Sequence, residues 1–114
     1  MSAFNTLLPF CSIEHFERGQ TIFRPDRPKV GLVVGGVVDV AWDFEGGMVA
    51  LACRGEGRII GAEGLILGHC PFTVSATNRT TFAWLSPGKL QSVLERLPSD
   101  QWQAVWRGLQ ESVL

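Results

Sequence analysis

The sequence predicts a mainly β fold, an antiparallel sandwich or barrel closed by C-terminal α-helices. Two observations support this class. Short runs rich in Val, Ile, Thr and Phe alternate with Gly and Pro through the first two-thirds of the chain. After Leu85 the apolar residues instead recur at the three- and four-residue spacing of amphipathic helices. With 114 residues, 46% of them apolar and 18% charged, the chain is expected to form one globular domain over 1–114.

The expected barrel covers about residues 12–86, and its strands are bounded by turn residues. Alternation of polar and apolar side chains is clearest from Val38 to Asp43. Glu45-Gly46-Gly47 follows that run, and because glycine tolerates positive φ, the strands on either side are expected to pair as a hairpin. The predicted strands are Gln20–Phe23, Val30–Val34, Val37–Trp42, Met48–Arg54, Arg58–Ile60, Thr73–Thr77 and Thr81–Leu85.

Two helices are expected at the C-terminus, over about 87–97 and 99–114. Ser86 and Pro87 are typical of a helix start, and Pro98 ends the first helix. Ser99-Asp100 is expected to cap the second helix. A further short N-terminal helix is expected near Ala3–Leu8 on weaker grounds.

Charge and cysteine content narrow the class of protein. The net charge is -1 and neither half is basic, so no nucleic-acid contact is expected from this chain. The longest apolar run is interrupted by Asp39 and is too short to span a bilayer, so no membrane contact is expected. The three cysteines are odd in number and far apart, as in reduced cytoplasmic proteins.

The order of several fragments resembles the effector domain of the CRP/FNR superfamily, a cyclic-nucleotide-binding-like double-stranded β-helix. The resemblance runs from about Gly19 to Leu97, through Gly36-Val37-Val38-Asp39-Val40, Gly57-Arg58-Ile59-Ile60-Gly61 and Val74-Ser75-Ala76. It implies a jelly-roll barrel that binds a small effector, a C-terminal helix that pairs two subunits, and a following helix-turn-helix domain. We do not expect that last domain within these 114 residues, because the sequence ends inside the expected pairing helix.

The nucleotide cassette of that family is incomplete here. Gly61 matches its glycine, but Ala62 stands where the family has glutamate, and Glu63 comes one position later, on the opposite face if the segment is a strand. Cys70 and Pro71 occupy the positions of the phosphate-binding Arg-Ser pair. Cyclic AMP and GMP are therefore not expected to bind. The expected ligand pocket lies between 57–65 and 70–76 and includes Gly61, Ala62, Glu63, Gly64, Leu65, Cys70, Pro71 and Phe72.

The sequence gives less support for a metal site, a reactive thiol or a catalytic site than for a ligand pocket. An iron–sulfur cluster needs four thiolates, and a metal site from His15, His69 and one cysteine is disfavoured, so no metal or cofactor is expected. Cys70 is the best candidate for a reactive thiol, and Cys53 is expected to be buried in a strand. Trp42 and Trp84 are expected in the core or the pocket wall. No catalytic motif is present, so no enzymatic activity is expected.

The last helix carries a stripe that is expected to form a homodimer seam: Trp102, Val105, Trp106, Leu109 and Val113. Packing of the two tryptophans against the chain's own barrel is the alternative. The leading hypothesis is a non-enzymatic, cytoplasmic regulatory module that senses an unidentified small molecule. The alternatives are the sensory part of a transcription regulator whose DNA-binding domain is not in this chain, and a dimeric interaction module that binds no ligand.

Overall fold

The computed structural model describes residues 5–112, leaving aside the side chains of Leu65 and Ile66. Its elements are η1 (Leu8–Phe10), β1 (Ser12–Phe16), β2 (Thr21–Phe23), β3 (Val30–Gly35), β4 (Val37–Phe44), β5 (Gly47–Gly55), β6 (Ile59–Ile60), α2 (Glu63–Ile66), β7 (Phe72–Ala76), β8 (Thr80–Leu85), α3 (Pro87–Arg96) and α4 (Ser99–Glu111). The predicted class, a mainly β jelly roll with C-terminal helices, is confirmed. The helix expected near Ala3–Leu8 falls partly outside the described residues.

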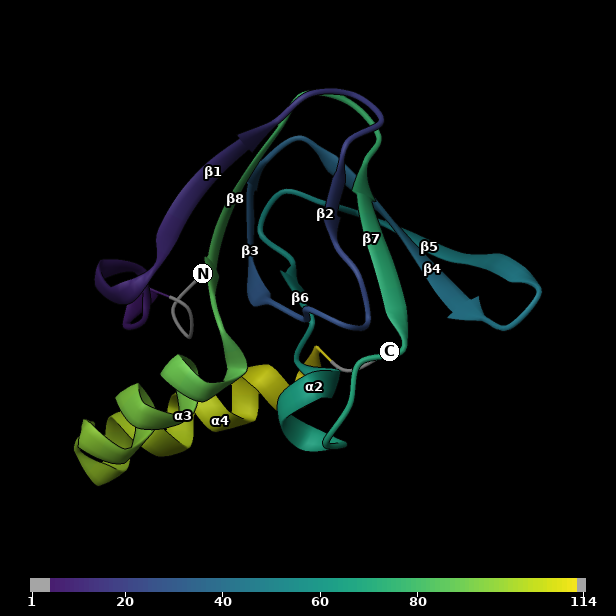
Figure 1. Cartoon of the computed structure of the whole chain (residues 1–114). Coiled ribbons are helices and arrows are strands. Elements are labelled where there is room, and N and C mark those ends of the chain that lie inside the picture. The colour runs from purple at the N-terminus through teal and green to yellow at the C-terminus, as the bar shows by residue number, and fades with distance from the viewer. Residues whose placement is uncertain (1–4, 113–114) are drawn as a thin grey trace.

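Two four-stranded antiparallel sheets form the barrel, with strand orders β1-β8-β3-β6 and β2-β7-β4-β5. Figure 1 shows the two sheets facing each other, α2, α3 and α4 gathered at one end, and the β4–β5 hairpin projecting beyond the barrel. The predicted hairpin is confirmed, because β4 and β5 pair from Val37 opposite Gly55 to Phe44 opposite Gly47. Among the described residues, no helix is both long and apolar enough to cross a bilayer.

Alternating side chains place the core between the sheets. On β4, Val38 and Val40 are fully buried while Asp39 and Ala41 are only half-buried, as the sequence pattern predicts. The barrel cluster also includes Phe16, Ile22, Phe23, Val33, Ile60, Cys70, Val74, Ala76 and Phe82. A second cluster seals the helical end of the barrel with Leu7, Val30, Leu32, Ile59, Ala62, Leu85, Leu90, Val93, Leu94, Val105 and Leu109.

The helix starts differ in how well the sequence predicts them. Ser86 caps α3 as predicted, with its Oγ accepting a hydrogen bond from the Lys89 N–H at 3.2 Å. The predicted Ser99-Asp100 cap is wrong, because the N-cap position of α4 is Pro98, which has no side-chain cap, and Ser99 is already helical. The rigid φ of proline sets this helix start in place of a side-chain cap.

Candidate functional site

The segment from Gly61 to Gly68 forms a short helix at the mouth of the barrel. Gly61 has φ +89°, and a side chain there would collide with the carbonyl oxygen of Lys29, so glycine is required. Helix α2 follows directly, with Ala62 at its N-cap, and it is closed by Gly68, whose φ is +83°. The expectation that Glu63 follows strand geometry is therefore wrong. Glu63 is the first residue of a helix and is almost fully buried.

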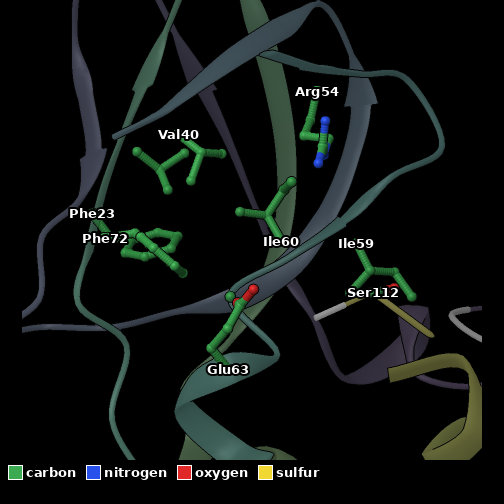
Figure 2. A pocket seen from close by; sticks show the side chains of 10 residues that line it. Phe23, Val40, Arg54, Ile59, Ile60, Glu63, Phe72 and Ser112 are labelled. Carbon is green, nitrogen blue, oxygen red and sulfur yellow. The ribbon is translucent and has the colours of Figure 1, made fainter. Parts of the chain in front are cut away.

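A cavity lies between this helix and the barrel strands. The cavity is lined by residues that are far apart in the sequence: Phe23, Val40, Arg54, Ile59, Ile60, Gly61, Glu63, Phe72, Val74 and Ser112. Figure 2 shows Phe23 and Phe72 together at one side, Glu63 at the α2 end and Arg54 on the strand wall. The cavity measures about 10 Å³, which is room for a single water molecule.

A wider groove opens beside this cavity. It measures about 530 Å³ and is lined by Leu51, Ala52, Arg54, Arg58, Phe72, Glu111 and Ser112. Three of these residues, Arg54, Phe72 and Ser112, also line the cavity, so the two spaces are neighbours. The groove falls in the range of about 300–1,000 Å³ that is typical of small-molecule sites, whereas the inner cavity does not.

The structure brings only some of the expected pocket residues together. Gly61, Glu63 and Phe72 line the cavity. Ala62 and Cys70 do not line it, because both are buried in the two core clusters. Gly64 is half-buried and lies beside Cys70. The carbonyl of Pro71 accepts a hydrogen bond from the Asp43 N–H at 3.0 Å. The side chain of Leu65, the last expected residue, is not described.

Arg54 is the charged cavity residue that the sequence did not predict, and Phe23, Val40 and Ser112 were likewise not among the expected pocket residues. The expected pocket covered 57–65 and 70–76, whereas these four residues come from outside those segments. The fold instead brings Arg54 to the cavity from β5. Arg58 lines only the outer groove. The Arg79 guanidinium is highly exposed and pairs with Glu17 at 3.3 Å. The sequence offered no signal for Arg54, because the register shift between β4 and β5 near Val40 decides that Arg54, and not Cys53, lies opposite the buried Val38.

The cysteines differ from expectation. Cys70 is buried, and burial is the main cause that raises the pKa of its thiol, so this candidate lacks both the exposure and the lowered pKa that a reactive thiol needs. Cys53 is exposed rather than buried, because it pairs with Asp39 on the outer face of the sheet, while its neighbours Ala52 and Arg54 pair with the buried Val40 and Val38. Its Sγ donates to Asp39 Oδ1 at 3.0 Å, and this hydrogen bond raises its pKa. Burial raises the pKa of Cys11 to about 11.

The histidines and strand tryptophans do not join the cavity. His15 Nδ1 lies 3.0 Å from Thr81 Oγ1, and His69 is exposed. No group of three potential metal ligands occurs among residues 5–112. Trp42 is 49% exposed, so its prediction as core or pocket wall is wrong. Trp84 packs at the edge of the barrel core, where the Lys29 ammonium lies 4.1 Å from its ring centroid.

The apolar residues of helix α4 lie in two different environments, the chain's own core and an open groove. Val105 and Leu109 are buried in the chain's own core, so these two expected dimer residues are not available to a partner. Trp102 and Trp106 stack on each other with centroids 5.8 Å apart and line a groove of about 320 Å³ between α3 and α4. Trp102 is 38% exposed, while Trp106 packs partly against the core. Val113 lies outside the described residues.

Comparison with solved structures supports the fold resemblance. The c-di-GMP-responsive global regulator CLP of Xanthomonas campestris matches 96% of this chain at a TM-score of 0.82 and 17% identity. The N-terminal domain of a Streptomyces coelicolor A3(2) transcriptional regulator matches 96% at a TM-score of 0.75 and 25% identity, covering 80% of that chain. The chain spans 55% of the length of CLP.

These neighbours are regulators of the CRP/FNR type, and the predicted resemblance to the effector domain of that family is confirmed in fold. The EAL enzyme Bd1971 also matches, over 89% of this chain and 94% of that one, at a TM-score of 0.65 and 17% identity. No protein-family model and no curated protein matches the chain.

Proposed function

We propose that this chain is a non-enzymatic regulatory domain that senses a small molecule other than a cyclic mononucleotide. One observation carries the proposal. The barrel has the fold of a CRP/FNR effector domain and keeps the cassette glycine, Gly61, yet Ala62, Cys70 and Pro71 stand at the positions of the cassette glutamate, arginine and serine. Because Ala62 and Cys70 are buried in the core clusters, neither supplies a polar contact to a phosphate or a ribose.

The cavity and the outer groove suggest where an effector binds. The cavity walls are apolar except for Arg54, Glu63 and Ser112. Since the cavity has room for one water only, an effector would bind in the groove beside Phe72 or displace α2. Arg54 faces both spaces and is the residue we expect an effector to contact.

Calorimetric titration with cyclic AMP and cyclic GMP tests the proposal. We expect no heat of binding, because Cys70 replaces the cassette arginine just before β7, and Arg54, which reaches the cavity from β5, shares it with Glu63. Titration with c-di-GMP belongs in the same series, since CLP is described as responsive to it. Micromolar binding of either mononucleotide would overturn the proposal, and loss of that binding in Arg54→Gln would place it at the cavity.

The small cavity also favours a second candidate function, an interaction module that binds no ligand. A volume of about 10 Å³ is far below what a small-molecule site needs. Native mass spectrometry of the purified chain separates the two functions, because a retained small molecule would exclude the second. In either case we propose that the chain works in the cytoplasm and that two copies associate through α4.

The chain can equally serve as the sensory part of a transcription regulator. Its match to about half of CLP supports this alternative. The DNA contacts would then come from residues outside this chain, in keeping with its net charge of -1. A longer reading frame in the source DNA distinguishes this alternative from a module that acts without DNA.

A further inference from the structure

Strand β5 (Gly47–Gly55) is an outer strand with an unprotected edge. It pairs only with β4, and its other side has no neighbouring strand in the described part of the chain. Most of its residues are exposed, including Met48 at 60%, Val49 at 46% and Leu51 at 47%. The register shift between β4 and β5 near Val40 is its one irregularity. Folded proteins usually protect such an edge, because free backbone N–H and C=O groups pair readily with another strand.

The other outer strands carry the protection that β5 lacks. Strands β2 and β6 are short, with 3 and 2 residues. Strand β1 has 5 residues and contains Glu14, which pairs with Lys29 at 3.2 Å. Strand β5 has 9 residues, and its stretch Gly47–Cys53 contains no charged residue and no proline. This combination of length, apolar composition and exposure is typical of a strand that is covered in the assembled protein.

We propose that β5 is a self-association surface, and that two copies pair their β5 strands antiparallel to form one continuous sheet. The charges at the two ends of the uncharged stretch favour a second copy as the occupant. Glu45 precedes Gly47–Cys53 and Arg54 follows it. Antiparallel pairing places the glutamate end of one copy beside the arginine end of the other, whereas parallel pairing would bring like charges together. The pairing with the greatest overlap of Gly47–Cys53 sets Ala50 opposite its own symmetry mate.

The apolar hairpin side chains support the same surface. Trp42 lies opposite Val49, and its ring lies 5.8 Å from that of Phe44, so all three belong to one face of the projecting hairpin. This face continues the barrel-facing side of β4 beyond the barrel, where no other described element covers it. A second copy joined at β5 would extend the sheet and place Val49 of each copy opposite Leu51 of the other, with Trp42 and Phe44 on the flanking β4 strands. The proposal does not depend on the effector or on the contact through α4.

Site-specific cross-linking tests the pairing. In a Cys53→Ser background, Ala50→Cys places one new thiol at the predicted two-fold axis, where opposite Cβ atoms lie about 5 Å apart. Mild oxidation is expected to give a disulfide-linked dimer from the dilute, folded chain. The control is Ile13→Cys in the same background, since Ile13 is also exposed, at 58%, and lies on the outer strand β1. Equal cross-linking of the two variants, or none in Ala50→Cys, would overturn the proposal.

Sedimentation provides a second measurement that needs no disulfide. Val49→Lys puts a like charge into both copies of the pair and is expected to weaken association at least about tenfold. Ile13→Lys makes the same change on β1 and should leave association unchanged. Loss of association only in variants of Trp102 and Trp106, or a wild-type chain that stays monomeric at all concentrations, would show that β5 is not used between copies.

Discussion

At position 61 the backbone bends with φ +89° and passes close to the carbonyl oxygen of Lys29. Gly61→Ala is expected to destabilise the fold for two reasons. The positive φ costs about 1–2 kcal/mol with a side chain, and relieving the collision costs roughly 1–3 kcal/mol more. Urea unfolding measures the sum. Gly57→Ala is the matched control, because Gly57 has φ +88° but open space around it. Equal losses in the two variants would contradict the close approach.

Single residues also show the limit of reading a site from sequence. Ala62, Cys70 and Pro71 replace the family's cassette residues, and this replacement can be read from the amino-acid sequence without a structure. The solvent exposure of a side chain cannot be read from the sequence in the same way. Cys53 lies in a predicted strand yet is exposed opposite Asp39, whereas Cys70 lies in the predicted loop beside His69 and is buried in the barrel core. The expected exposure of the two cysteines is therefore reversed, because strand register and barrel packing decide it, and the pKa of both thiols is raised.

At the scale of elements, helix α3 depends on its N-terminal cap. Ser86→Ala removes the acceptor of the Lys89 N–H and is expected to lower the free energy of unfolding by about 1 kcal/mol. Ser92→Ala in the same helix is the control, because the Ser92 hydroxyl donates to the Gly88 carbonyl within the helix and caps no backbone N–H. Thermal unfolding followed by circular dichroism compares the two. A larger loss in Ser92→Ala would contradict the role of the cap.

Elements with a strong local signal were predictable. The β4–β5 hairpin follows from its glycines and its alternation, and α3 follows from Ser86-Pro87 and its apolar stripe. Helix α2 was missed because it has only 4 residues, too few for a helical periodicity to stand out. Its position after Gly61 and before Gly68 was the available local signal.

At the scale of the whole molecule, the proposed contact through α4 rests on its two tryptophans. Trp102→Ala with Trp106→Ala is expected to shift sedimentation toward the monomer, because the stacked rings line an open groove between α3 and α4. Arg107→Ala, on an exposed position of the same helix, is the control. Trp106 also packs partly against the core, so a melting curve must show that the double variant is folded. An unchanged sedimentation coefficient in the folded double variant would contradict the proposed association through α4.

The sequence by itself determined the class of fold, the hairpin, the capped helix α3 and the absence of the cassette arginine. Each of these depends on neighbouring residues or on residue identity, which local physics connects directly to structure. Only the tertiary structure decided that Arg54 reaches the cavity, that Val105 and Leu109 are used in the chain's own core, and that β5 keeps an open edge. These features depend on which distant strands become neighbours, and side-chain periodicity carries no information about that order.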